Sequence, residues 1–294
     1  MASWSPSRRA LIGAAIAATL AGRIQAAGLS TSRVVALDWA SAQNLLALGV
    51  PPMALPETER YAQLVVEPAL PAVTRDLGLR SEPNLELVME LAPDLVLMGN
   101  DLEAMRDSIA RFAPVEVFAP DGFDGGDPMA KGGAALLALA LRLGLEERQD
   151  AFMRSFENDM RAANQRLHDY DGRPVFIATV VDGRRLLLFG KNSMYQSVLD
   201  RFGILNAWTG FTTAYGHVTV TADRLLQQPD ARLLCVGDSS AIALEKLLQT
   251  PVIASLPFVR EGRVVRIPDV LFYGGLPAAH RFARLSSAAL AQGR

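Results

Sequence analysis

The chain has 294 residues, of which half are hydrophobic and a fifth are charged, and its formal net charge is −2 at pH 7. This mildly acidic balance disfavours nucleic acid and anionic lipid as partners, because both attract clusters of positive charge. The single cysteine, Cys235, excludes a disulfide within the chain. At about 100–200 residues per domain, the length is sufficient for two domains with separate cores.

The first 27 residues have the features of an export signal. Arg8 and Arg9 form a twin-arginine pattern, and an uncharged apolar run follows at 10–22. This run is too short to span a bilayer, which takes about 20 apolar residues. Small residues at 26–28 then offer a cleavage site. We therefore expect residues 1–27 to be a signal peptide that directs the mature chain to a periplasm.

Strands alternate with helices along the rest of the chain, which indicates α/β units with a partly parallel sheet. In the first half we expect strands at 33–39, 95–98 and 115–118 and helices at 42–48, 84–91 and 101–112. An apolar segment rich in Ala and Leu follows at 129–145. A second series of strands and helices is expected at 175–180, 185–189, 196–202, 223–228, 233–236, 241–248 and 264–267.

One long helix is expected between the two series. Residues 146–168 contain neither Gly nor Pro, and Phe152, Phe156, Met160 and Ala163 recur at helical spacing. At ~1.5 Å per residue the helix is about 35 Å long, enough to cross from one lobe to another. We therefore divide the mature chain into an N-terminal lobe, a connecting helix and a C-terminal lobe, at 28–144, 145–170 and 171–294.

The two halves also repeat one pattern. Residues 84–99 and 221–237 each contain an acid, a short helix with one apolar face, Pro-Asp, an apolar strand and a Gly. The acids are Glu86 and Asp223, and the distance from acid to Pro is seven residues in one half and six in the other. Two similar lobes joined by a helix predict a cleft between them, where small ligands usually bind.

Side chains that carry catalysis or hold metals are sparse. The three histidines, His168, His217 and His280, lie outside metal-ligand spacing. The chain has no Gly-rich phosphate loop and no Gly-x-Ser-x-Gly pattern. The segment 237–239 resembles the opening of a serine-esterase motif, but it lies far from the N-terminus and no Asp-x-x-His follows near the chain end. The pattern favours a binding protein, with an exported hydrolase as an alternative.

Candidate ligand-binding residues follow the expected strands. Arg80 ends a turn-rich stretch, and Ser193 opens a helix whose free N–H groups favour oxygen ligands, although capping alone explains Ser193 equally well. The loop at 213–217 carries an aromatic residue and a hydrogen-bond donor. The stretch 271–275 places a Tyr beside two glycines, where a side chain with one apolar and one polar end is useful.

The chain resembles the periplasmic ferric-hydroxamate siderophore binding proteins of ABC importers over essentially its whole length. The segments that carry the resemblance are Val34-Val-Ala-Leu-Asp-Trp39, Leu45-Leu-Ala-Leu-Gly49, Glu67-Pro-Ala-Leu-Pro71, Gly78-Leu-Arg-Ser-Glu-Pro-Asn-Leu-Glu86, Leu188-Phe-Gly-Lys-Asn-Ser193, Gly203-Ile-Leu-Asn-Ala-Trp208, Pro257-Phe-Val-Arg-Glu-Gly262 and Phe272-Tyr-Gly274. The resemblance implies two α/β lobes joined by one long helix, with a shallow cleft. It also implies that the siderophore itself cages the iron, so that the protein needs no cofactor and no metal ligand of its own.

Family positions for ligand contacts also follow from the resemblance. Arg80 and Tyr273 match the two residues that hydrogen-bond the hydroxamate oxygens around the iron. Trp39 and Trp208 keep aromatic positions of the cleft, whereas Tyr215 replaces a Trp. Three leucines stand where the family has aromatic residues, which implies a more aliphatic and roomier cleft, and these are Leu64, Leu102 and Leu271.

The resemblance further implies a partner. Glu86 and Asp223 match acids, one on each lobe, that meet arginines of two inner-membrane permease subunits, and we expect the binding protein itself to be a monomer. The identity of the siderophore stays open among ferrichromes, ferrioxamines, mixed-ligand chelates and catecholates. A haem or corrinoid binding protein of the same fold is the main alternative, because Tyr215 and His217 offer side chains that suit haem.

Overall fold

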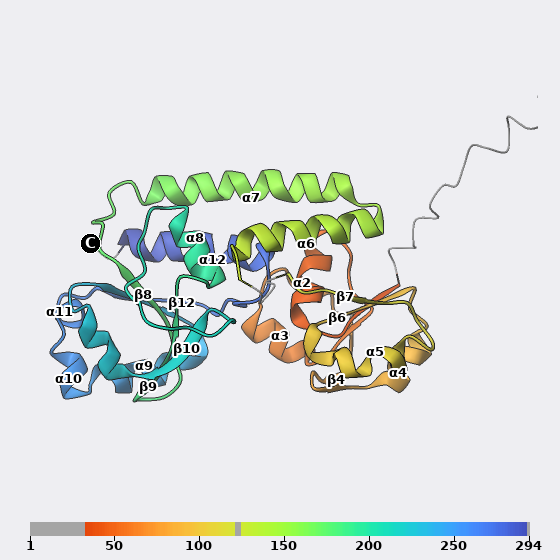
Figure 1. The fold of residues 1–294 in the computed structure, drawn as a ribbon, viewed down its shortest axis with the longest axis horizontal. Helices are drawn as coiled ribbons and strands as arrows, with labels where there is room; N and C mark the ends of the chain where they lie inside the picture. Colours follow the sequence, from red (N-terminus) through yellow and green to blue (C-terminus); the bar gives the residue numbers. More distant parts are fainter. Residues whose placement is uncertain (1–32, 121–124, 293–294) are drawn as a thin grey trace, which may run out of the picture.

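The computed structural model describes residues 33–120 and 125–292, and the expected signal peptide with Arg8 and Arg9 lies outside these described residues. Two α/β lobes lie side by side, and a layer of three helices covers one side of both (Figure 1). The two-lobed α/β class predicted from the sequence, with one long helix joining the lobes, is confirmed.

The N-terminal lobe is built on a parallel three-stranded sheet. Its strand order is β1-β6-β7, and two short strand pairs, β2 with β3 and β4 with β5, lie beside it. The strands are β1 (Val34–Ala36), β2 (Ala54–Leu55), β3 (Arg75–Asp76), β4 (Gly78–Leu79), β5 (Glu82–Pro83), β6 (Leu95–Met98) and β7 (Val115–Val117). The helices are α2 (Trp39–Ala47), α3 (Thr58–Leu64), α4 (Leu85–Leu91), η1 (Asn100–Met105) and α5 (Arg106–Ile109).

The C-terminal lobe is built on a mixed five-stranded sheet. Its strand order is β10-β9-β8-β11-β12, with β11 parallel to both neighbours and β9 antiparallel to both of its own. The strands are β8 (Val175–Val180), β9 (Arg185–Phe189), β10 (His217–Thr221), β11 (Arg232–Val236) and β12 (Val264–Ile267). The helices are α8 (Met194–Asp200), η2 (Ala222–Gln227), η3 (Asp238–Ser240), α9 (Ala241–Leu248), α10 (Pro251–Ala254) and α11 (Pro257–Arg260).

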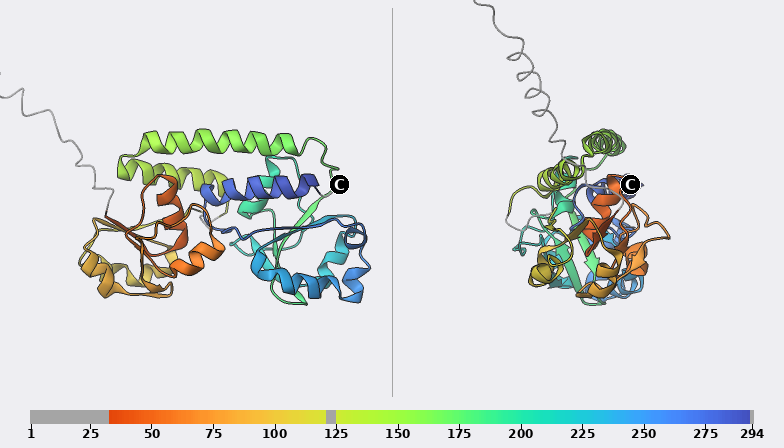
Figure 2. Two further views of the ribbon diagram at one scale, coloured as in Figure 1. Left: turned by 180° about the vertical axis from the view of Figure 1, so that it is seen from behind. Right: turned by 90° about the vertical axis from the view of Figure 1, so that its right-hand side faces the viewer.

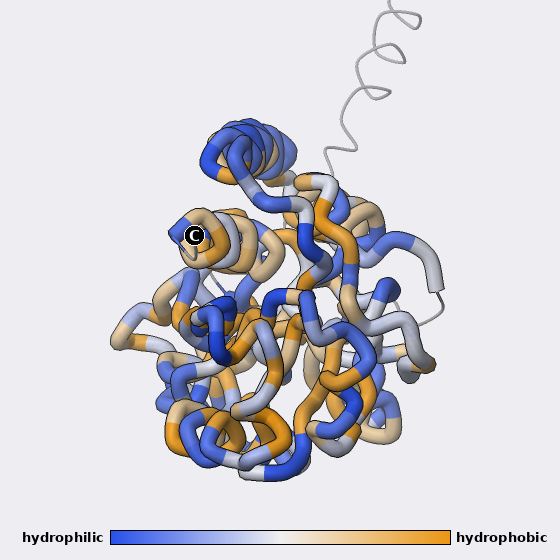
Figure 3. The backbone as a smooth tube through the Cα atoms, turned by 90° about the vertical axis from the view of Figure 1, so that its left-hand side faces the viewer, coloured by the Kyte–Doolittle hydropathy of each residue, from blue (hydrophilic) through white to orange (hydrophobic). Residues whose placement is uncertain are grey.

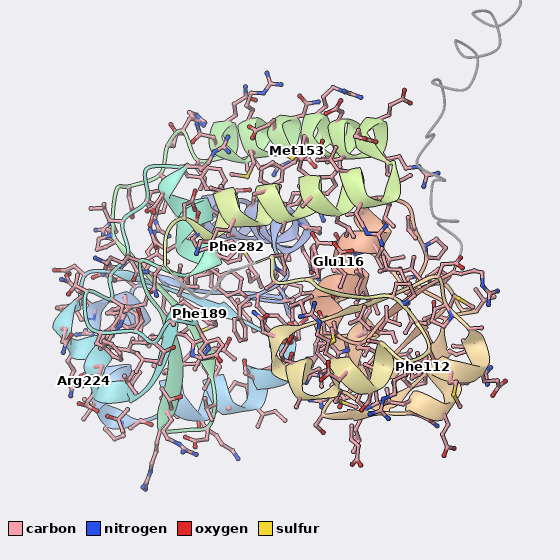
Figure 4. All side chains as sticks on the ribbon, turned by 45° about the vertical axis from the view of Figure 1, so that its right-hand side comes forward. Phe112, Glu116, Met153, Phe189, Arg224 and Phe282 are labelled. Atoms are coloured by element: carbon pink, nitrogen blue, oxygen red, sulfur yellow. The ribbon has the colours of Figure 1, made fainter. Side chains whose placement is uncertain are left out.

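The covering layer consists of α6 (Pro128–Leu143), α7 (Glu146–Arg166) and α12 (Leu276–Gln292). The long helix α7 is mostly hydrophilic (Figure 3), and it buries the predicted stripe through Phe156, Met160 and Ala163. Helix α12 lies between α7 and the sheet of the C-terminal lobe (Figure 2), and it packs against α7, α8, α6 and α2. Met153 of α7 and Phe282 of α12 lie in the same hydrophobic core (Figure 4). The lobes therefore share a helical base rather than a flexible linker.

Several elements differ from the sequence expectation. The strand expected at 33–39 ends at Ala36, because Asp38 caps α2 by accepting a hydrogen bond from the Ser41 amide at 2.8 Å. The helix expected at 101–112 is a 3₁₀ turn followed by the short α5. The loop expected at 213–217 ends in β10, which begins at His217. Among the described helices, none is long and apolar enough to cross a membrane.

Candidate functional site

A cleft of about 470 Å³ opens at the C-terminal ends of the strands of the N-terminal lobe, where that lobe meets the loop before α12. In an open parallel sheet these ends are the usual place for a ligand. Two segments of the C-terminal lobe complete the wall. The lining residues are Leu37, Asp38, Ala40, Arg80, Gly99, Asn100, Asp101, Phe118, Ala119, Pro120, Tyr215, Phe272 and Tyr273.

Arg80 comes from the tight β4–β5 hairpin and reaches across to the other lobe. Its Nη1 donates a hydrogen bond to the Tyr273 hydroxyl at 3.0 Å, and its Nε donates to Glu57 Oε2 at 3.0 Å. The guanidinium also stacks on the Trp39 ring at 3.8 Å from the ring centroid. These contacts fix the plane of the guanidinium, and they use only two of its five N–H groups. The rest are available to oxygen atoms of a ligand.

Glu57 and Trp39 both contact the Arg80 guanidinium. The role of Glu57 was not predicted from the sequence. Glu57 has a left-handed backbone, with φ 52°, and its amide donates to the Gly78 carbonyl at 2.9 Å, which ties α3 to the hairpin. Trp39 is 2% exposed and donates from Nε1 to the Pro56 carbonyl at 3.1 Å. Each residue is therefore held by a hydrogen bond that does not involve the Arg80 side chain. Together they fix the position of the guanidinium.

Tyr273 lies in the loop between β12 and α12, with its ring against Phe272. Burial raises the pKa of its phenol, while the positive charge of Arg80 acts in the opposite direction. The phenol is therefore protonated at neutral pH. Because its oxygen accepts from Arg80, its O–H points elsewhere and can donate to a ligand oxygen. Arg80 and Tyr273 thus form a pair of donors, one from each lobe.

Two carboxylates share the cleft wall with these donors. Asp38 accepts from the Ser41 amide and from the Ser41 hydroxyl, and burial raises the pKa of Asp38 to about 6. Asp101 lies close by, since a Cβ on Gly99 would approach the carboxylates of both acids. The cleft lining therefore carries both a guanidinium and two carboxyl groups, and all three act electrostatically on Tyr273.

Tyr215 lines the cleft as expected, but His217 does not. The Tyr215 side chain is 55% exposed, and its ring stacks on that of His217 at 6.1 Å. His217 in turn meets Phe272 edge-on at 5.1 Å, and burial lowers its pKa. The imidazole therefore fills the space behind the cleft wall.

Six further residues expected near the ligand lie outside the cleft lining, and one of them, Trp39, contacts Arg80 instead. Ser193 is 3% exposed and caps α8, since its hydroxyl accepts from the Gln196 amide at 3.2 Å and donates to the Gly190 carbonyl at 2.7 Å. The others pack in or against hydrophobic cores, and they are Leu64, Leu102, Trp208 and Leu271. None of the three leucines lines the cleft, and four of the residues that do are aromatic.

Glu86 and Asp223 are both exposed, in the first turns of α4 and η2. Both elements lie on the side of the molecule away from α7 (Figure 1), and Figure 4 labels Arg224, which is adjacent to Asp223. Each acid is followed two residues later by a buried anchor, Val88 or Leu225, so the repeated pattern produces the same local packing in both lobes.

Other parts of the described residues are weaker candidates for a ligand or metal site. A second cavity of about 310 Å³ near the end of α7 contains several arginines, but Asp171 pairs with Arg232 at 2.7 Å and Glu261 with Arg263 at 3.0 Å. Within 33–120 and 125–292, no three His, Cys, Asp or Glu side chains gather where they could hold a metal ion.

The lining residues missed by sequence reasoning share one signal. Asp38, Gly99 and Phe118 each follow directly, or within two residues, the end of a parallel strand. Parallel strands end at the same edge of a sheet, so these positions could have been grouped from the strand pattern alone. Glu57 gave no such signal, because its role depends on a left-handed turn.

Comparisons with known proteins agree with this architecture. The periplasmic binding protein family matches residues 34–271. The iron(3+)-hydroxamate-binding protein FhuD of Escherichia coli K12 is 36% identical over 260 residues, which cover 88% of this chain and 87% of that protein. The siderophore-binding protein FhuD of Vibrio cholerae, solved with Fe³⁺-Desferal, superposes with a TM-score of 0.83 at 25% identity, covering 90% of this chain and 99% of the other.

A more distant structure extends the likeness in fold. The petrobactin-binding protein YclQ of Bacillus subtilis has a TM-score of 0.71 at 17% identity, covering 88% of this chain and 92% of the other. The strand order, the helical base and the matches over most of the length lead to one conclusion. The chain belongs to the periplasmic binding protein family.

Proposed function

We propose that this chain is the periplasmic binding component of an ABC importer and that it binds a ferric hydroxamate siderophore in the cleft between its lobes. The observation that carries this proposal is the donor pair of Arg80 and Tyr273, held together at 3.0 Å across the lobes. The similarity to the two FhuD proteins supports the same ligand class. The chain would act by binding and release rather than by catalysis.

The chemistry of the cleft suits this ligand. Hydroxamate oxygens carry partial negative charge even when they coordinate iron, and a guanidinium fork matches such clustered oxygens. The phenol adds a neutral donor, while aromatic rings at Phe118, Tyr215 and Phe272 offer apolar contact to the organic part of the siderophore. Iron would arrive as cargo inside its chelator.

Haem is less well supported as a ligand. A haem iron needs an axial side chain that reaches into the cleft, and His217 packs behind Tyr215 and against Phe272. Tyr215 does line the cleft, so haem and cobalamin belong in the binding test.

Export and docking complete the proposal. The twin-arginine pattern at Arg8 and Arg9 would send the folded chain to the periplasm. Glu86 and Asp223, exposed one per lobe on the side away from α7, would meet basic residues on two permease subunits. The repeat supports a partner with two similar halves, because it presents one exposed acid in the first turn of a helix in each lobe.

The test is a titration of the mature chain with a panel of ligands, followed by tryptophan fluorescence. Trp39 contacts Arg80, so occupancy of the cleft should change its emission. Ferric hydroxamates should quench the signal to saturation at a 1:1 ratio, and a ferric catecholate, haem and cobalamin should bind far more weakly. Tight binding of haem or cobalamin, with no response to any ferric hydroxamate, would overturn the proposal.

A further inference from the structure

Helix α2 carries two adjacent amide side chains, Gln43 and Asn44, which are both fully buried. Asn is a poor residue for a helix interior. In each side chain the carbonyl oxygen is buried without a hydrogen-bond partner. An unpartnered buried acceptor costs stability, so such a pair calls for an explanation beyond packing.

The hydrogen bonds that the Asn44 amide nitrogen donates explain why this residue is buried here. Its Nδ2 donates to the Ala40 carbonyl at 2.8 Å, within α2, and to the Gly274 carbonyl at 2.9 Å, which belongs to the loop before α12. The second bond joins residues 230 positions apart and crosses from one lobe to the other. Asn44 therefore holds the backbone carbonyl of Gly274, the residue directly after Tyr273.

The loop is shaped for this contact. A Cβ on Gly274 would lie 2.0 Å from Gln43 Oε1, and one on Gly275 would lie 2.8 Å from a side-chain carbon of Pro120. Gly275 also has a left-handed backbone, with φ 70°. Only glycines allow the loop to lie flat on α2, so the amide can reach the backbone.

Apart from the bond between Arg80 and the Tyr273 hydroxyl, two side chains of the C-terminal lobe also hold this loop, through its backbone carbonyls. The Tyr195 hydroxyl donates to the Val270 carbonyl at 2.5 Å, and Arg281 Nε donates to the Asp269 carbonyl at 3.2 Å. Both lie at the start of the loop, before Tyr273. Asn44 is therefore the side chain that fixes the far end of the loop to the lobe that carries Arg80.

We infer that Asn44 is a positioning residue for the ligand site: by holding the Gly274 carbonyl it places the Tyr273 hydroxyl against Arg80. This inference rests on the proposed function, in which that hydroxyl is a donor to the siderophore. Asn44 itself does not line the cleft, so it acts through the loop and not through a contact with the ligand.

The test is a double-mutant cycle with Asn44→Leu and Tyr273→Phe, read as the dissociation constant of a ferric hydroxamate. Leu keeps the branched shape and the number of side-chain heavy atoms of Asn and removes the donor. Because Asn44 acts through the Tyr273 hydroxyl, its loss weakens binding by no more than the loss of that hydroxyl, about 2- to 13-fold. In the Tyr273→Phe background the same substitution should change affinity less than about 2-fold. If the loss of affinity in the double variant equals the product of the losses in the two single variants, the inference is overturned.

Gln196 offers a matched control. It is 2% exposed, has an unpartnered Oε1 and donates from Nε2 to the Ile204 carbonyl at 2.9 Å, but all its partners lie within the C-terminal lobe. Gln196→Met should lower stability much as Asn44→Leu does and leave siderophore affinity within about 2-fold. A loss of affinity equal to that of Asn44→Leu would reduce Asn44 to a structural role.

A second readout needs no ligand and separates this inference from the proposed function. Hydrogen exchange of the amides at 271–279 should speed up by about 2- to 13-fold in Asn44→Leu, the range that one hydrogen bond supplies. It should not change in Gln196→Met. Unchanged exchange in Asn44→Leu overturns the inference whichever ligand the cleft takes, whereas a parent that binds no ferric hydroxamate overturns the proposed function alone.

Discussion

Replacing Arg80 with Lys should abolish tight siderophore binding while leaving the fold almost intact. Lys keeps the positive charge, but it lacks the planar fork by which Arg80 donates from Nε and Nη1 and stacks flat on Trp39. A charge-assisted hydrogen bond to the ligand is worth ~1.5–3 kcal/mol. Its loss corresponds to a roughly 10- to 150-fold weaker dissociation constant.

The effect of the same substitution on stability should be smaller. The side chain of Arg80 is 33% exposed and that of its partner Glu57 is 13% exposed, so solvent screens much of the pair. Such a pair contributes about 0–1 kcal/mol, and a partly exposed stack on Trp39 adds about 0.5–1 kcal/mol. Affinity should therefore fall much further than the free energy of unfolding.

Arg60 is the matched control for this experiment. It also pairs with Glu57, at 3.2 Å, and lies over the same Trp39 ring at 5.9 Å, but it is not part of the cleft lining. Fluorescence titration should show Arg60→Ala within about 2-fold of the parent, because a screened surface ion pair contributes little. If Arg80→Lys binds as tightly as the parent, or if Arg60→Ala loses as much affinity, the assignment of Arg80 as the charged donor is refuted.

Three further predictions concern export, docking and pH. Changing Arg8 and Arg9 together to Lys should leave uncleaved precursor in the cytoplasm, and normal periplasmic yield on fractionation would exclude the twin-arginine route. Changing Glu86 and Asp223 together to Ala should abolish transport in a reconstituted importer at unchanged siderophore affinity, and normal transport would remove both acids from the docking surface. Asp38→Asn should flatten a pH dependence of stability: burial raises the pKa of Asp38 from 3.8 to about 6, so between these pH values the folded chain keeps a proton that the unfolded chain has lost. The free energy of unfolding of the parent should then fall as pH rises through this window, by at most about 3 kcal/mol, since Asp38 is partly exposed. The free energy of unfolding would be measured by denaturant titration at several pH values. If it falls equally steeply with pH in both proteins, Asp38 does not cause the pH dependence.

Local sequence patterns predicted most of the fold because the buried strands are short apolar runs and α7 buries a single face. The buried stripe on α7 and the strands β6, β8 and β9 appear at the residues expected for them. Helix α12 was not foreseen, because it is covered by helices on several sides and buries Arg281, Ser286 and Ser287 along with its apolar residues.

The candidate site was predictable only in part, for a different reason. Arg80 and Tyr273 were singled out through resemblance to a family, and the structure brings them to hydrogen-bonding distance. Glu57 and Asn44 could not be found in this way, because a left-handed turn and a contact between residues 230 positions apart leave no local pattern. Ser193 suited either a ligand contact or a helix cap, and the three-dimensional structure shows the cap.

The most direct measurement is a crystal structure of the mature chain bound to a ferric hydroxamate. We expect the ligand in the cleft between the lobes, with hydroxamate oxygens of the iron centre about 2.7–3.2 Å from Arg80 nitrogens and from the Tyr273 hydroxyl. We also expect that Asn44 Nδ2 keeps its hydrogen bond to the Gly274 carbonyl. A siderophore bound elsewhere on the chain, or held in the cleft with neither Arg80 nor Tyr273 in contact with its oxygens, would contradict the account.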